Sequence, residues 1–172
     1  MNTLVGNYFG LIHLISGVIA LIFGGLVLLL KKGTKTHKKA GYVYALSMAV
    51  LIISSFGVYR LFGKLGVFHA LSLVSTFSLL AGMLPMLKKN RTPKDYETHF
   101  NRMYWSVVGL FAAFAAESFV RIPKFGTFWE IVAWSFVIIF IACFIIFIKI
   151  RPVWSKEFGT NRPALVQEEK NC

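Results

Sequence analysis

Four histidines are the residues of this chain best suited to bind a metal or a haem iron: His13, His37, His69 and His99. Each lies near the start of a long apolar stretch, and short linkers make successive stretches run in opposite directions. This alternation predicts His13 and His69 near one membrane face, and His37 and His99 near the other. Two imidazoles at one depth supply the two axial ligands of a six-coordinate haem.

Small residues near two of these histidines predict room for a flat macrocycle. Gly17 and Gly41 each follow a histidine by four residues, so they share its helical face one turn away. Gly24, eleven residues after His13, falls within about 20° of that histidine on a helical wheel. The same glycine stripe is also typical of helix packing, and both interpretations stay open.

The leading functional hypothesis is electron transfer across a membrane by two b-type haems, each held by two histidines. Lys38 and Arg102, one and three residues after the inner histidines, are candidates to pair with haem propionates. The positive end of a helix dipole disfavours imidazolium, which leaves the neutral ring that acts as a ligand. The two levels are separated by about 22 Å of helix. The electron donor and acceptor stay unnamed, with a quinol or a small reductant as candidates.

Two alternative hypotheses compete with haem. Glu117 follows His99 by eighteen residues, which is five helical turns, so it lies on the same face at the opposite end. His13, His69 and Glu117 could then form a zinc or non-haem iron site at the outer face, hydrolytic if water completes it. Against this, Glu117 could simply pair with Arg121 one turn on. The third hypothesis is a non-catalytic membrane scaffold whose histidines only mark membrane interfaces.

Five apolar stretches must position these residues, and they predict helices over residues 8–30, 40–59, 67–87, 93–120 and 128–150. A membrane-spanning helix needs roughly 20 apolar residues, and 56% of the 172 residues are hydrophobic while only 15% are charged. We therefore predict an all-α integral membrane protein with five transmembrane helices, a four-helix antiparallel bundle plus one accessory helix. Residues 1–160 form one domain and 161–172 a flexible tail. Thr92, Pro93 and Asp95 predict an N-cap that starts the fourth helix.

The net charge of the chain is +12, and its basic residues fall in clusters between the apolar stretches. These clusters predict which ends of the helices face the cytoplasm. Fifteen of the nineteen basic residues fall in alternate linkers and the C-terminal segment, which indicates the cytoplasmic side of a bacterial inner membrane, with the N-terminus outside. No basic residue precedes Lys31, so the first stretch is expected to be a retained helix. A nucleic-acid binder would spread its basic residues over a folded polar face, so we expect lipid rather than nucleic acid as partner. A homo-oligomer stays open.

Short motifs give the chain a family resemblance. Through the segment His37–Tyr42, His69 and the segment His99–Met103, it resembles a poorly characterised bacterial family of small multi-histidine membrane proteins, over roughly the first four helices. More distantly it is similar to the ascorbate-dependent transmembrane cytochromes b561, in which four histidines bind two haems between diagonal helices. That resemblance implies transmembrane electron transfer. The chain departs from those cytochromes in having five predicted helices where they usually have six, and it has no ascorbate-site motif.

Overall fold

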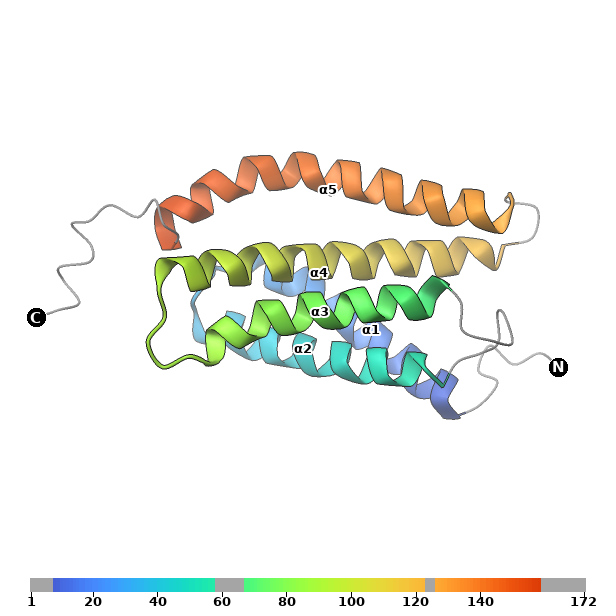
Figure 1. Cartoon of the computed structure of the whole chain (residues 1–172), viewed down its shortest axis with the longest axis horizontal. Coiled ribbons are helices and arrows are strands. Elements are labelled where there is room, and N and C mark those ends of the chain that lie inside the picture. Colours follow the sequence, from blue (N-terminus) through green and yellow to red (C-terminus); the bar gives the residue numbers. More distant parts are fainter. Residues whose placement is uncertain (1–7, 58–66, 123–125, 159–172) are drawn as a thin grey trace, which may run out of the picture. The chain divides into compact units, whose positions relative to one another are not determined.

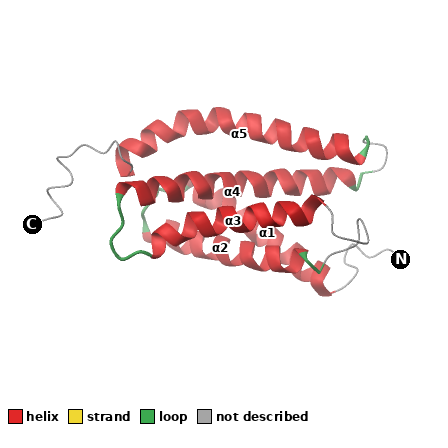
Figure 2. Cartoon of the chain, in the orientation of Figure 1, coloured by secondary structure: helices red, strands yellow, loops and turns green. Residues whose placement is uncertain are grey.

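The computed structural model describes residues 8–57, 67–122 and 126–158, and these residues are almost entirely helical. The helices are α1 (Tyr8–Leu29), α2 (Lys35–Ser55), α3 (Val67–Leu87), α4 (Pro93–Val120) and α5 (Phe128–Phe158), and the described residues contain no strand (Figures 1 and 2). The predicted all-α class is thus confirmed. The chain divides into two compact units, residues 1–80 and residues 81–172, with the division inside α3.

Within the residues that the structure describes, four helical segments are long and apolar enough to cross a bilayer: α1, the part of α3 from His69 to Leu87, α4 and α5. The helix α2 is not among them. Its first turns carry Lys35, Lys38 and Lys39, and the apolar remainder, residues 40–55, falls short of the roughly 20 residues needed. The helices are therefore consistent with the predicted membrane character, and the predicted count of five spans is not confirmed, because four of the described segments qualify.

The start predicted for α2 at residue 40 is too late. Thr34 caps the helix, because its side-chain oxygen accepts a hydrogen bond from the His37 backbone N–H at 3.2 Å. The helix therefore begins at Lys35 and ends at Ser55, with Phe56 as its C-cap. Hydropathy marked the edge of the apolar stretch, whereas the cap begins the helix about one turn earlier. The predicted end at residue 59 lies outside the described residues.

The helix α5 continues past its predicted end at residue 150 to Phe158, with Pro152 inside it. Contacts with α4 hold these last turns. The Trp154 ring stacks on Phe100 with centroids 4.4 Å apart, and Arg151 Nη2 lies 3.0 Å from Glu97 Oε1. Because these partners come from another helix, the hydropathy of α5 alone could not predict them. The predicted flexible tail from residue 161 lies outside the described residues.

In the first unit, α1 packs against α2 through small residues. The buried positions of α1 are Ser16, Ala20, Gly24 and Val27, which recur every three or four residues on one face. At the end of α1 the Lys32 ammonium donates to the Val27 and Leu28 carbonyls, at 2.7 and 2.8 Å. Carbonyls in the last turn of a helix lack partners, so this lysine caps α1. Burial lowers the pKa of Lys32.

In the second unit, aromatic side chains join α4 to α5. Tyr104 and Phe100 lie against Phe147, with ring centroids 5.0 and 6.0 Å away, and the Tyr104 hydroxyl donates to the Cys143 carbonyl at 2.7 Å. Away from this contact, α5 exposes large apolar side chains such as Ile138, which is 62% exposed. Exposed apolar side chains along a long helix are expected where lipid is the solvent.

Candidate functional site

His99, on α4, is held through one ring nitrogen by a backbone carbonyl of α3. Its Nδ1 lies 2.7 Å from the Gly82 carbonyl oxygen. A carbonyl oxygen can only accept, so Nδ1 carries the hydrogen and donates. In the neutral ring Nε2 then carries the lone pair. Metal-ligating histidines are oriented in this way, with the second nitrogen donating to a carbonyl or carboxylate.

The α3–α4 contact at His99 depends on glycine at position 82. A Cβ built on Gly82 would lie 2.7 Å from Met103 Sδ and 3.2 Å from Arg102 Cβ. Both distances are shorter than ordinary contact, so a side chain here would displace the Met103 side chain and require a small shift of the α4 backbone at Arg102. Gly82 was missed by the sequence analysis. The available signal was a glycine three residues before Pro85, which interrupts the backbone hydrogen bonding of the same helix.

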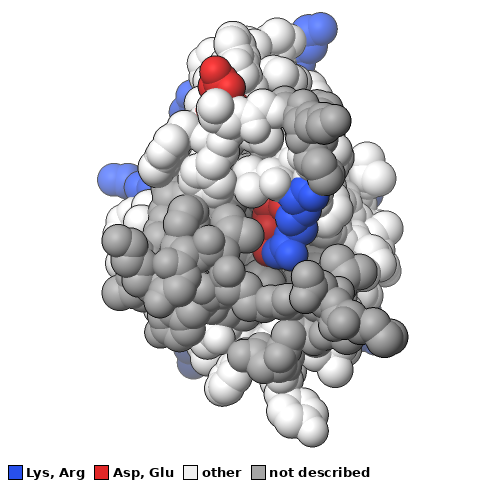
Figure 3. Space-filling view, turned by 90° about the vertical axis from the view of Figure 1, so that its right-hand side faces the viewer, with Lys and Arg blue, Asp and Glu red and all other residues white. Residues whose placement is uncertain are grey.

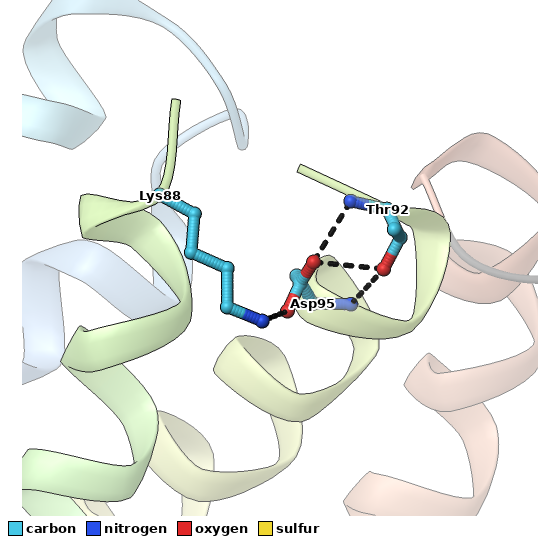
Figure 4. A network of polar contacts seen from close by, with 3 residues as sticks. All are labelled: Lys88, Thr92 and Asp95. Atoms are coloured by element: carbon cyan, nitrogen blue, oxygen red, sulfur yellow. Dashed lines mark hydrogen bonds and ion pairs between the residues drawn. The ribbon is translucent and has the colours of Figure 1, made fainter. Parts of the chain in front are cut away.

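A polar network around the buried Asp95 starts α4 one turn before His99 (Figure 4). The Thr92 backbone N–H donates to Asp95 Oδ2 at 2.8 Å, and the Asp95 N–H donates to the Thr92 hydroxyl at 3.3 Å. Lys88 Nζ lies 2.5 Å from the other Asp95 oxygen. This reciprocal capping box confirms the N-cap predicted at Thr92. Asp95 precedes His99 by four residues, so the network fixes the helical turn that carries the histidine.

His13, on α1, is held by a hydroxyl of α2. Its Nδ1 lies 3.3 Å from Ser54 Oγ, and Ser54 Oγ donates to the Leu51 carbonyl at 3.0 Å. A rotated Ser54 hydroxyl could donate to Nδ1 of His13, but while the Ser54 hydrogen lies on the Leu51 carbonyl, the Ser54 oxygen accepts from Nδ1. Nε2 is again the nitrogen with the lone pair. The same geometry argues against Ser54 as a nucleophile activated by His13, because the serine hydrogen points at a carbonyl.

His69, on α3, is buried at the same end of α2. Its ring lies 5.9 Å from the Phe56 ring, measured between centroids, and only 8% of the residue is exposed. One turn further along α3, Ser72 Oγ lies 2.9 Å from Ser55 Oγ. Residues 54–56 of α2 therefore contact α1 beside His13 and α3 around His69. These contacts put both histidines at one level of the first unit.

His37 occupies the first turn of α2, where its backbone is bonded to the Thr34 cap. His37 is half-buried, and the neighbouring Lys38 is exposed. His37 belongs to the first unit, whereas His99 and the exposed Arg102 belong to the second. The pairing of the two inner histidines therefore stays a prediction, as do the propionate roles of Lys38 and Arg102.

The three glycines expected to make room for a macrocycle have different surroundings. Gly24 is buried in the face that α1 presents to its own unit, and a Cβ on Gly17 would lie 3.4 Å from Leu51 Cδ1. Both positions favour the helix-packing interpretation. Gly41 differs, because a Cβ there would meet no atom within 4 Å. Only the space beside Gly41, one turn after His37, supports the macrocycle interpretation.

Glu117 forms the ion pair with Arg121 that was predicted as the alternative to a metal-binding role. Arg121 Nη2 lies 2.5 Å from Glu117 Oε1, four residues apart on α4. In the space-filling view toward the α4–α5 turn, a basic group lies directly against an acidic one (Figure 3). Across the ranges that the structure describes, no group of three or more His, Cys, Asp or Glu side chains is placed to hold a metal ion. The zinc or iron site of His13, His69 and Glu117 thus has no support here.

Comparison with known proteins agrees with the membrane assignment. Neither a curated protein nor a solved structure gives a match to the chain. One family model matches residues 10–154, which include nearly all of α1 to α5. Its description names the membrane and no activity. Because the match covers far more than half of the sequence, the chain belongs to the family described as "Predicted membrane protein (DUF2306)".

Proposed function

We propose that this membrane protein binds two b-type haems and transfers electrons across the bilayer. His13 and His69 would ligate the outer haem, and His37 and His99 the inner one. A haem held by two histidines can pass a single electron without changing its ligands, which suits it to electron transfer. The observation that carries the proposal is that one ring of each pair is held through Nδ1: His99 donates to the Gly82 carbonyl, and His13 lies against the Ser54 hydroxyl.

The donor role of Nδ1 matters because it leaves Nε2 with the lone pair that can ligate the haem iron. A hydrogen bond from Nδ1–H to an oxygen fixes the tautomer, orients the ring and makes Nε2 a better base. One histidine of each proposed pair has this arrangement, His13 through Ser54 and His99 through Gly82. A histidine that only lies at a membrane interface does not require a hydrogen bond from Nδ1 to a neighbouring helix.

Two further observations support the outer and inner sites separately. At the outer level, the end of α2 contacts α1 beside His13 and α3 around His69, as two ligands at one depth require. At the inner level, the open space at Gly41 leaves room near His37, and Lys38 and Arg102 are exposed cations suited to propionates.

The topology belongs to the same proposal. We take α2 as the fifth span, with α1 to α4 in an antiparallel bundle and α5 as the accessory helix. The basic linkers then lie in the cytoplasm of a bacterial cell, with the protein in the inner membrane and the N-terminus outside. This arrangement follows the resemblance to cytochromes b561 that the four histidines suggest, and a quinol or small reductant would be the electron donor. A homo-oligomer is compatible with it.

The absorption spectrum of the full chain, purified in detergent, tests the proposal. We expect a Soret band, and two haems per chain by the pyridine hemochrome assay. His13→Ala and His99→Ala should each lose about half of the haem, because each removes one ligand of a different site. Added imidazole should restore part of the band in both variants. Lys89→Ala, an exposed change in a basic linker, is the control and should keep both haems.

Three outcomes contradict the proposal or part of it. Protein that contains no porphyrin but holds zinc or iron by elemental analysis would favour the alternative site of His13, His69 and Glu117. Protein with neither, which also tolerates all four His→Ala changes, would be a scaffold. Full haem content in both single variants would disprove the ligand assignment alone.

A further inference from the structure

The C-terminal half of α5 has a face that packs on α4. Phe147 and Trp154, seven residues apart, are only 9% and 7% exposed. Both rings stack on Phe100 of α4, with centroids 6.0 and 4.4 Å away. Since the two residues lie on one side of the helix, they define the direction in which α5 meets its own unit.

Lys149 and Lys156 lie on the opposite face of α5. At 100° per residue, two positions seven apart differ by only about 20°, and the pair lies about 160° from Phe147 and Trp154. Both lysines are exposed. Ile138 and Ile145, 62% and 53% exposed, lie on the same side further into the helix. One face of α5 therefore carries exposed apolar side chains, followed toward its C-terminal end by Lys149 and Lys156.

These two lysines differ from the arginine between them. Arg151 is neutralised by Glu97 of α4, at 3.0 Å. Lys149 and Lys156 make no ion pair within residues 81–122 and 126–158, the part of their unit that the structure describes. The exposed Glu157 points about 100° away from Lys156, because neighbours in sequence do not face each other on a helix. Their positive charge is therefore presented outward.

We propose that Lys149 and Lys156 bind the phosphate of an anionic phospholipid at the membrane surface. The stripe of Ile138 and Ile145 faces the acyl chains, and the lysine stems extend along it toward the headgroup. The two lysines are separated by about 10 Å along the helix, so both can reach the headgroup region from neighbouring depths. Charge complementarity selects anionic over zwitterionic lipid. This proposal does not depend on the haem hypothesis.

Lipid preference of the full chain in vesicles tests the proposal. Electron paramagnetic resonance of spin-labelled phosphatidylglycerol and phosphatidylcholine measures how strongly each lipid is immobilised by the protein. We expect preference for phosphatidylglycerol, with a contribution of about fivefold per lysine near the surface. Lys149→Gln with Lys156→Gln should remove most of that preference. Lys149→Arg with Lys156→Arg should retain it, because the positive charges remain.

The internal control is the neighbouring ion pair. Arg151→Gln with Glu97→Gln removes one charge of each sign and should leave the lipid preference unchanged. Circular dichroism should show equal helix content in all variants, since both lysines are exposed. Equal immobilisation of the two lipids, or an unchanged preference in the double glutamine variant, would overturn the proposal. Displacement of phosphatidylglycerol by inorganic phosphate at constant ionic strength would assign the lysines to a free anion and also overturn it.

Discussion

His99 and His13 are both held through Nδ1, but by acceptors of different kinds. His99 bonds to the Gly82 carbonyl, which cannot donate, so the tautomer of the ring is dictated. His13 bonds to the Ser54 hydroxyl, which can rotate and offer its hydrogen instead. The second unit therefore fixes its histidine more firmly than the first. A backbone acceptor also cannot be removed by substitution, whereas a serine can.

Packing around the two histidines differs in the same direction. Beside His99, a Cβ on Gly82 would come within 2.7 Å of Met103 Sδ, and beside His13, one on Gly17 would stay 3.4 Å from Leu51. The network of the buried Asp95 adds charged hydrogen bonds one turn from His99, while the hydrogen bonds described near His13 and His69 involve the serine hydroxyls of α2 and α3. Close packing is not confined to the second unit, however, because a Cβ on Gly57, just after α2, would lie 2.7 Å from Phe9 Cγ of α1.

The largest expected effect comes from adding one methyl group to each glycine. Gly82→Ala should destabilise the protein by about 2 kcal/mol, because Met103 and the helix backbone must shift. Gly17→Ala should be neutral or stabilising by up to about 1 kcal/mol, because alanine favours helix and the contact is ordinary. Thermal unfolding in detergent measures both. Equal stability of the two variants would show that the packing at Gly82 is no tighter than the packing at Gly17.

The helix caps should give a smaller difference between the units. Thr92→Ala should cost about 1 kcal/mol, because it removes one half of a buried reciprocal box with Asp95. Thr34→Ala should cost about half as much. Its cap has His37 at the third helical position, where no carboxylate returns a hydrogen bond. Denaturant unfolding of the two variants measures this difference. A larger loss of stability in Thr34→Ala than in Thr92→Ala would contradict the prediction.

Loss of the hydroxyl that holds His13 should have a modest cost. Ser54→Ala removes the acceptor of Nδ1 and the bond to the Leu51 carbonyl, for about 1 kcal/mol. If the outer haem is present, its content should fall while the inner haem is kept, because His99 is unaffected. Haem content after purification measures this. Ser155→Ala, a buried serine of α5, is the matched control and should keep both haems.

The smallest effect is spectroscopic. In protein prepared without haem, ¹⁵N spectra of the imidazoles should show His99 almost entirely with hydrogen on Nδ1. His13 should show a mixture of tautomers, since the serine can act as donor or acceptor. A mixed His99 would mean that the Gly82 bond does not control the ring. A single tautomer at His13 would show that the Leu51 carbonyl holds the Ser54 hydrogen firmly.

Local patterns predicted the parts of the site that depend on neighbouring residues. The order Thr92, Pro93 and Asp95 predicted the cap of α4, because capping needs only residues three positions apart. Glu117 and Arg121 predicted their ion pair for the same reason. The start of α2 was missed, because its cap lies in a basic segment where hydropathy is low.

The sequence by itself determined that this is a helical membrane protein, where α4 begins, and that its histidines fall at helix starts. Hydropathy and short-range spacing carry that information. Only the tertiary structure decided what holds each imidazole, Gly82 for His99 and Ser54 for His13. Those bonds join residues from different helices, so they depend on how each helix is rotated and shifted against its neighbour. The spacing of residues within one helix cannot predict that rotation.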